Sequence, residues 1–258
     1  MQTLTTYRSE AERIVRAAGR IAAQAYPRAK ETWRKGDGSE VTRCDVDVEK
    51  AILAGLGAAF PDAGFLCEES GEQDVDREFV WILDPIDGTS YFARQVPVYS
   101  ISLGLRRGEE LVLGVVYHPQ TDECFTAEAG RGAWRNGEPI TCSTTEDLSS
   151  ARLAVEIPGR DAPEEMIATA MYRLGKLVNA AERVRVFGAS AWGLCYTASG
   201  GFDAYLALSG GSKIWDIAAG RVILEQSGGL YTTCHDHAVV AGPRALHDAL
   251  IELLDLTV

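Results

Sequence analysis

The stretch WILDPIDGTSYF, residues 81–92, opens as an apolar strand and places Asp84 and Asp87 where that strand ends. A carboxylate at the edge of a protein core is costly unless a positive partner meets it. Pro85 stiffens the chain between the two acids, and Gly88 lets the backbone approach a ligand closely. The stretch therefore predicts a cation site at the end of a buried strand.

Three other segments also place acids where an element of the core ends. They are VTRCD with Asp45, FLCEES with Glu68 and Glu69, and KIWDIAAG with Asp216. A single acid of this kind can be a surface residue or a helix cap, and Asp216 before IAAGRVILE fits an N-cap. Several buried acids that converge without a cation would be strongly unfavourable. Taken together, the acids predict a metal site.

The ligand type narrows the chemistry of that site. Oxygen ligands favour Mg²⁺ before Mn²⁺ or Ca²⁺ and disfavour zinc. Shared carboxylates would let two such ions lie about 4 Å apart, as in two-metal phosphoryl chemistry. A helix beginning at GTSYF would turn free N–H groups toward a phosphate beside the ions. Without metals, each carboxylate would repel the phosphate by about 3 kcal/mol at about 5 Å and an effective dielectric constant near 20.

The composition limits the partners and the compartment. With 25 Lys and Arg against 37 Asp and Glu, the net charge of −12 disfavours non-specific nucleic-acid binding. The beginning, MQTLTTYRSEAER, lacks the pattern of a signal peptide, and no stretch reaches the apolar length of a membrane span. Six cysteines without a C-x-x-C pair are typical of reduced thiols. We therefore expect a cytoplasmic protein that acts on a small molecule and binds neither nucleic acid nor membrane.

Hydrophobic periodicity divides the chain into two halves. Helical spacing over about residues 7–29, and again around Val48 to Leu56, precedes strand-like runs that predict an antiparallel meander from FVWILD to ECFTAEA. After RNGEPI, strands alternate with helices near residues 162–178, 190–199, 216–227 and 243–254. We expect an α+β half over residues 1–140 with most of the metal ligands. An α/β half over residues 141–258 would carry Asp216 and the residues that determine substrate specificity, with the active site between the halves.

The motifs together resemble the inositol monophosphatase family of Mg²⁺-dependent, lithium-sensitive phosphatases. Four motifs carry the resemblance: WILDPIDGTSYF, KGDGSEVTRCD, EES and WDIAAG. Less specific stretches such as GVVYHPQTDECFTAEAGRGAW extend it over nearly the whole chain. The resemblance implies a layered α-β-α-β-α sugar-phosphatase fold, two tightly packed halves and a homodimer. It also implies a phosphoric monoester hydrolase that acts through metal-activated water.

The resemblance further implies which residues hold the ions. Glu68, Asp84 and the carbonyl of Ile86 would hold one Mg²⁺, and Asp84, Asp87 and Asp216 would hold a second. A third, more weakly bound ion would be coordinated by Glu68 and water. Mn²⁺ is a possible substitute for Mg²⁺.

The same resemblance implies the catalytic and substrate-binding roles. Thr89, paired with Asp45, would position and deprotonate the attacking water, and Glu68 is a further catalytic residue. The backbone of Gly88 and Thr89 would hold the phosphate, with Asp216 near the leaving-group oxygen. The residues expected to bind substrate are Asp87, Gly88, Thr89, Ser90, Asp216 and Lys35, the last at the mouth of the site.

One departure from the family pattern keeps the substrate open. Inositol-specific members carry an acid shortly before W-D that contacts the sugar ring, whereas ALSGGSKIWD offers Ser209, Ser212 and Lys213. Inositol monophosphate stands first as the expected substrate. Histidinol phosphate, fructose 1,6-bisphosphate and 3′-phosphoadenosine phosphate are the alternatives. A non-catalytic scaffold or regulator is the alternative from another class, although none of the metal acids nor Thr89 is missing.

Two cysteines adjoin the proposed site. Cys44 directly precedes Asp45, and Cys67 directly precedes Glu68. We expect both as small buried hydrophobes. The sharper hypothesis is that oxidation of either thiol disturbs the metal ligands and inhibits the enzyme.

Overall fold

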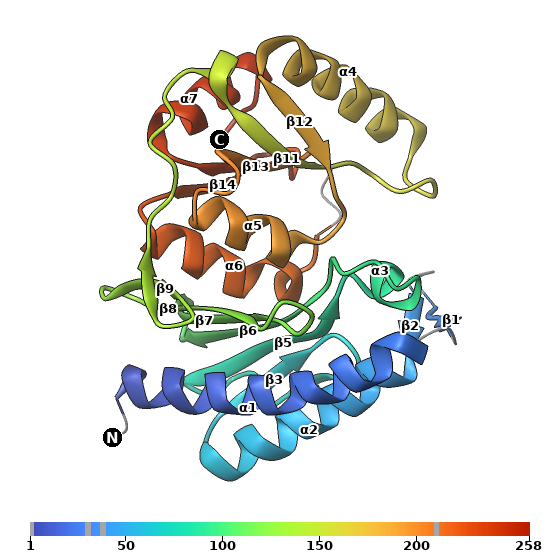
Figure 1. Ribbon diagram of the computed structural model, residues 1–258, viewed down its shortest axis with the longest axis vertical. Coiled ribbons are helices and arrows are strands. Elements are labelled where there is room, and N and C mark those ends of the chain that lie inside the picture. The colour runs from blue at the N-terminus through green and yellow to red at the C-terminus, as the bar shows by residue number, and fades with distance from the viewer. Residues whose placement is uncertain (1–2, 29–31, 37–39, 209–211) are drawn as a thin grey trace.

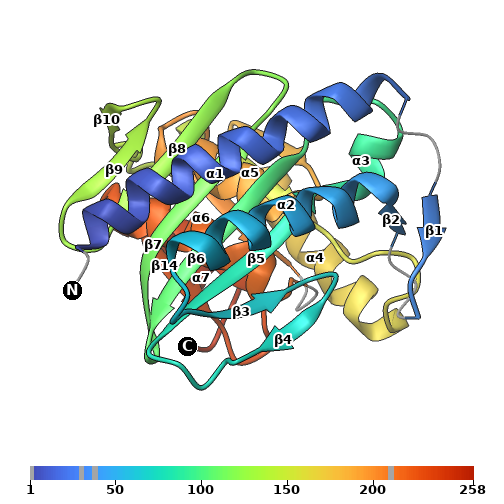
Figure 2. The ribbon, with the colours of Figure 1, turned by 90° about the horizontal axis from the view of Figure 1, so that it is seen from below.

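Helices and sheets alternate in five layers (Figure 1). The structure is a computed structural model that describes residues 3–28, 32–36, 40–208 and 212–258. From bottom to top in Figure 1, the layers are α1 (Leu4–Ala25) with α2 (Arg43–Ala59), an eight-stranded sheet, α5 (Ser190–Ala198) with α6 (Ile214–Gln226), a five-stranded sheet, and α4 (Glu164–Ala180) with α7 (Arg244–Leu253). This order confirms the layered α-β-α-β-α fold. Figure 2 shows α1 and α2 side by side across the first sheet.

The eight-stranded sheet carries most of the acids of interest. Its order is β10-β9-β8-β7-β6-β5-β3-β4, and only β3 (Gly64–Cys67) and β5 (Phe79–Asp87) pair in parallel. The antiparallel pairing of β5 to β8 confirms the predicted meander. The remaining strands are β4 (Gly71–Gln73), β6 (Ser100–Arg107), β7 (Glu110–His118), β8 (Glu123–Glu128), β9 (Gly132–Arg135) and β10 (Glu138–Ile140).

The five-stranded sheet is mixed. Its order is β12-β11-β13-β15-β14, with β11 parallel to both neighbours and β15 antiparallel to both of its own. Its strands are β11 (Arg152–Glu156), β12 (Arg183–Val186), β13 (Ala204–Ala207), β14 (Leu230–Thr233) and β15 (Val239–Gly242). The short elements are β1 (Thr32–Arg34) paired with β2 (Glu40–Thr42), α3 (Thr89–Ala93), and 3-10 turns at Tyr26–Arg28 and Leu148–Ser150. Among the described residues, no helix is both long and apolar enough to cross a membrane.

Three apolar layers hold these five layers together. The first lies between the eight-stranded sheet and α1 and α2, the second surrounds α5 and α6 between the two sheets, and the third lies between the five-stranded sheet and α4 and α7. Both faces of each sheet are therefore covered. Burial on both faces explains why β5 reads as a continuous apolar run rather than an alternating one. Representative buried residues are Ile14, Ile52 and Trp81 in the first apolar layer, Phe125, Leu194 and Val222 in the second, and Leu153, Leu177 and Leu250 in the third.

Helix α6 lies very close to the eight-stranded sheet because small residues face each other there. Gly104 and Gly114 are paired across β6 and β7. A Cβ atom at Gly104 would lie 3.0 Å from the Cβ of Ala218, and one at Gly114 would lie 2.4 Å from the carbonyl oxygen of Ala219. Ser102 Oγ on β6 also donates to the carbonyl of Trp215 at 3.1 Å. These contacts fix the start of α6, and with it Asp216, against the strands that carry the other acids.

We expect Gly114→Ala to lower the free energy of unfolding by about 1–3 kcal/mol, because the added methyl group must push α6 away from β7. Gly175→Ala is the control. Gly175 is an exposed residue of α4 with no heavy atom within 4 Å of the added Cβ, so its replacement should raise stability by up to about 1 kcal/mol. Urea unfolding measures both. A Gly114→Ala protein as stable as the wild type would contradict the close approach.

Candidate active site

A bulge in β5 turns Asp84 and Asp87 toward the same side of the sheet. Side chains alternate along a strand, so two residues three positions apart would normally face opposite sides. Here Asp84 pairs with Ser102 and Asp87 pairs with Ser100, so β5 has one more residue than β6 between these pairs. Pro85 lies in the bulge, where its missing N–H costs no ladder bond.

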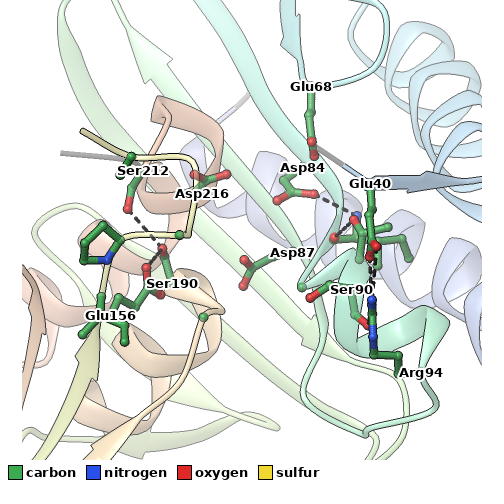
Figure 3. A pocket seen from close by; sticks show the side chains of 18 of the residues that line it. Glu40, Glu68, Asp84, Asp87, Ser90, Arg94, Glu156, Ser190, Ser212 and Asp216 are labelled. Atoms are coloured by element: carbon green, nitrogen blue, oxygen red, sulfur yellow. Dashed lines mark hydrogen bonds and ion pairs between the residues drawn. The ribbon is translucent and has the colours of Figure 1, made fainter. Parts of the chain in front are cut away.

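The two acids open into a pocket of about 610 Å³ (Figure 3). All five predicted metal ligands line this pocket, together with the predicted phosphate-binding residues at the start of α3. Glu68 follows β3, Asp216 comes from α6 beyond the sheet, and the remaining residues come from the end of β5 and from α3. The predicted residues that line the pocket are Glu68, Asp84, Ile86, Asp87, Gly88, Thr89, Ser90 and Asp216.

The clustered acids are electrostatically unfavourable. Burial, followed by the negative charges of Glu68, Asp87 and Asp216, raises the pKa of Asp84 well above its usual value. The pKa of Asp87 is also raised, mainly by burial, although Ser100 Oγ and the N–H group of Ala191 donate to its Oδ2 at 3.3 and 3.1 Å. Burial is likewise the main cause that raises the pKa of Asp216 to about 6. Oxygen donors that repel one another in this way fit a hard cation.

The side chains of the acids are not close enough together to form a preformed metal site in the described residues. In the part of the chain that the structure describes, no three His, Cys, Asp or Glu side chains are grouped as a preformed metal site. Lys35 Nζ lies 2.8 Å from Glu68 Oε1 and 2.7 Å from Glu69 Oε1. Burial alone would lower the pKa of Lys35, but its hydrogen bonds to these two carboxylates raise it. Lys35 thus does not line the pocket itself but contacts Glu68, which does. Residues 37–39 of the KGDGSEVTRCD motif lie outside the described residues.

Asp45 and Thr89 form a hydrogen-bonded pair beside the acids. Thr89 Oγ1 lies 3.0 Å from Asp45 Oδ1 and 3.0 Å from the carbonyl oxygen of Ile86. The backbone N–H of Thr42 donates to Asp45 Oδ2 at 2.9 Å, which caps the start of α2. Burial raises the pKa of Asp45 to about 6, although these hydrogen bonds oppose the shift. Asp45 is therefore a fixed acceptor for the Thr89 hydroxyl.

Asp216 both caps a helix and lines the pocket. The N-cap of α6 is Lys213 and the helix begins at Ile214, so Asp216 lies at the third helical position rather than at the N-cap. Its Oδ2 accepts a hydrogen bond from the Lys213 N–H at 2.6 Å. Lys213 itself is exposed, and Ser209 of the same segment lies outside the described residues.

Sequence reasoning missed several residues of the pocket. Glu156, Ser190 and Ser212 line one side of it, and Figure 3 shows them across the pocket from Ser90. Glu156 ends the apolar strand RLAVE, which is the same signal that identified Asp84, so it could have been found. The charged residues at the mouth, Arg34, Glu40 and Arg94, had no comparable signal.

The two cysteines next to the site are poor candidates for oxidation. Cys44 and Cys67 are both buried. Burial raises the pKa of each thiol to about 12. Oxidation by peroxide proceeds through the thiolate, so the structure favours the reading of Cys44 and Cys67 as small buried hydrophobes.

Comparisons with known proteins agree with this geometry. The model of the inositol monophosphatase family matches residues 3–255. "Nus factor SuhB" of Escherichia coli K12 is 33% identical over 256 residues, covering 95% of this chain and 94% of the relative. "Fructose-1,6-bisphosphatase/inositol-1-monophosphatase" of Aquifex aeolicus is 30% identical, covering 98% and 97%. The crystal structure of the Bartonella henselae suhB protein superposes with a TM-score of 0.88 at 30% identity, covering 94% of this chain and 95% of that one.

The fold, the pocket and these likenesses define a phosphatase of the phosphoric monoester hydrolase class. The chain belongs to the inositol monophosphatase family.

We expect Asp87→Asn to stabilise the protein in a chelating buffer, and to do so more at about pH 8 than at about pH 5. The folded-state pKa of Asp87 is raised above the unfolded value of 3.8, so the folded protein keeps a proton that the unfolded chain has released. The free energy of unfolding of the wild type therefore falls as pH rises through this window. Asparagine has no such titration.

Urea unfolding at the two pH values measures this difference, and Asp76→Asn on the exposed surface serves as the control. An Asp87→Asn effect that is equal at both pH values would contradict the raised pKa.

Proposed function

We propose that the protein is a Mg²⁺-dependent phosphomonoesterase of small polyol or sugar phosphates, with inositol monophosphate as the first candidate substrate. The observation that carries the proposal is the convergence of Glu68, Asp84, Asp87 and Asp216 on one pocket beside the Thr89–Asp45 pair. These acids come from distant parts of the chain and repel one another, which is unfavourable unless cations bind between them.

The donor set fits Mg²⁺, with Mn²⁺ as a possible substitute, because every proposed ligand is an oxygen. Glu68, Asp84 and the carbonyl of Ile86 would hold one ion, and Asp84, Asp87 and Asp216 a second. A third, weaker ion would be held by Glu68 and water. When bound, such ions offset the charge of the phosphate and lower the pKa of coordinated water.

The chain's own groups supply the remaining steps. Asp45 can accept a proton through Thr89, whose hydroxyl would orient the attacking water and help deprotonate it. Gly88 has a φ of 90° and begins α3, so the free N–H groups at this turn can bind phosphate. A Cβ at Gly88 would lie 2.8 Å from the carbonyl oxygen of Val98, which explains the glycine. Ser90 and Asp216 would complete the contacts to phosphate and leaving group.

The order of candidate substrates follows from the relatives and the pocket mouth. Inositol monophosphate comes first among the candidate substrates, because two of the relatives are named for inositol monophosphatase. Fructose 1,6-bisphosphate follows, supported by the name of the Aquifex relative and by Arg34 and Arg94 at the mouth, where a second phosphate could bind. Histidinol phosphate and 3′-phosphoadenosine phosphate stand behind these. A scaffold without catalytic activity is disfavoured because the acids and Thr89 are all present.

We further propose that the protein is cytoplasmic, that it is a homodimer, that Li⁺ inhibits it, and that residues 1–140 and 141–258 form its two halves. Size-exclusion chromatography with light scattering tests the homodimer, and Li⁺ titration of the activity tests the inhibition.

A phosphate-release screen tests the proposed function. Inositol, histidinol, fructose and nucleotide phosphates are each offered with Mg²⁺ and with a chelator. We expect Mg²⁺-dependent release from at least one polyol or sugar phosphate, and loss of that release in Asp87→Asn, because a proposed metal ligand is removed while apolar packing stays intact. The surface variant Asp76→Asn should retain full activity. Metal-independent release, or none from any ester, would contradict the proposal.

We expect Thr89→Ala to lower kcat by about 100-fold or more, because it removes the hydroxyl that links Asp45 to the water. The Mg²⁺ concentration for half-maximal activity should change little. Thr89→Ser keeps the hydroxyl and should recover most of kcat. Steady-state kinetics with Mg²⁺ titration separate the two effects, and a Thr89→Ala enzyme with wild-type kcat would refute this role.

A further inference from the structure

Helix α5 begins without a cap of its own. Its N-cap residue is Ala189, whose side chain cannot accept a hydrogen bond from the first turn. The first N–H groups of a helix have no partner within the helix, and a buried N–H without an acceptor is unfavourable. Ala189 and Ala191 are both buried, so water has little access to this end of α5. The acceptor must therefore come from another part of the chain.

Asp87 supplies this acceptor from β5, 104 positions before Ala191. Its Oδ2 atom accepts hydrogen bonds from the N–H groups of Ala191 at 3.1 Å and Trp192 at 3.4 Å. These residues are the second and third of α5, and their N–H groups are the ones that a helix cap binds. Figure 3 shows the carboxyl group of Asp87 turned toward Ser190, the first residue of α5. Asp87 is therefore the cap of a helix in the middle layer, although it belongs to the first sheet.

Ser100 binds the same oxygen of Asp87 from the neighbouring strand. It lies on β6 opposite Asp87, is fully buried, and its Oγ atom donates to Asp87 Oδ2 at 3.3 Å. Oδ2 thus accepts three donors, whereas one carboxyl oxygen has about two acceptor positions, so none remains for an ion. Oδ2 can accept these hydrogen bonds whether or not Oδ1 carries a proton, so the arrangement does not depend on the charge of Asp87.

The three contacts determine which part of Asp87 a cation can reach. Asp87 lines the pocket, and because Oδ2 is occupied, its Oδ1 atom is left for the proposed ion. Hydrogen-bond partners of a metal-binding carboxylate orient it, and their loss typically lowers metal affinity by about 10- to 100-fold. Ser100 does not line the pocket itself, so any effect on an ion would act through Asp87.

We infer that Ser100 is a positioning residue for Asp87, and that Asp87 joins the proposed metal site to α5 by capping this helix. Helix α5 packs against α6, which carries Asp216, so the cap also links the two acids that come from different halves of the chain. The part of the inference that concerns the ion deepens the proposed function and rests on it. The cap itself can be tested without any metal.

The first test measures Mn²⁺ binding through the electron paramagnetic resonance signal of free Mn²⁺. For Ser100→Ala we expect the ion proposed to bind Asp87 to be held about 10-fold more weakly, because the carboxyl group loses a partner that orients it. The other proposed ion, which Asp87 does not hold, should keep its affinity within about twofold. A general structural defect would not separate the two ions in this way.

Ser227→Ala is the matched control for this measurement. Ser227 is a buried serine at the end of α6 that lies outside the pocket, and its Oγ atom donates to the carbonyl of Leu224 at 2.7 Å. Its replacement should leave both Mn²⁺ affinities unchanged. Thermal unfolding establishes that each variant is folded. If Ser100→Ala does not fold, Ser100→Cys takes its place with the same expected result, because a thiol is only a weak donor.

The second test follows amide hydrogen exchange in a chelating buffer. Asp87→Ala and Asp87→Asn both remove the carboxylate, but asparagine keeps a side-chain oxygen that can cap a helix. We expect the amides of Ala191 and Trp192 to exchange about 3- to 30-fold faster in Asp87→Ala than in Asp87→Asn, the range that corresponds to loss of a helix cap. Amides in the first turn of α7, which begins at Arg244, should exchange equally in both variants.

The possible results separate the inference from the proposed function. Equal exchange at the start of α5 in the two Asp87 variants would overturn the cap. Unchanged Mn²⁺ binding in the Ser100 variant, or an equal loss for both ions, would overturn the positioning role of Ser100. A wild-type protein that binds no Mn²⁺ would contradict the proposed function and the role of Ser100 with it, while hydrogen exchange would still decide the cap.

Discussion

One extra residue in β5 determines the geometry of the whole site. Without the bulge between Asp84 and Asp87, the alternation of side chains would bury one acid among the apolar residues under α1 and α2. With it, both acids face the layer that contains α5 and α6. The bulge also places the Ile86 carbonyl oxygen 3.0 Å from Thr89 Oγ1, so one irregularity orients two acids, a carbonyl and a hydroxyl.

The second constraint is the close packing of α6 on the eight-stranded sheet. Gly104 and Gly114 leave room for the backbone of α6, and its small residues make that approach possible. The position of Asp216 is therefore set by contacts of the α6 backbone with the sheet, and it does not depend on a flexible side chain elsewhere. The acids of β5 and the acid of α6 are held on two rigid elements, and such rigidity is what a precise binding site requires.

The rest of the structure compensates for the unfavourable burial and mutual repulsion of the acids in the pocket. Burial raises the pKa of Asp45 and Asp216 to about 6, and it also raises the pKa of Asp84 and Asp87. This destabilisation is offset by the three apolar layers and by backbone N–H groups directed at Asp45, Asp87 and Asp216. Groups with perturbed pKa values in a pocket are typical of functional sites.

The sequence by itself identified most of the acids and the division into an α+β half and an α/β half, because an acid after an apolar run is a local signal and helical periodicity is readable along the chain. The layered fold came from the resemblance of its motifs to the family. Hydrophobic periodicity also placed the meander of β5 to β8, whose strands follow one another directly. Only the tertiary structure decided that Asp216 lies at the third position of α6, and that Glu156 and Ser190 share a pocket with Asp87. These residues are more than 60 positions from Asp87 in the chain. Their meeting depends on how two sheets pack around α5 and α6, which no local pattern encodes.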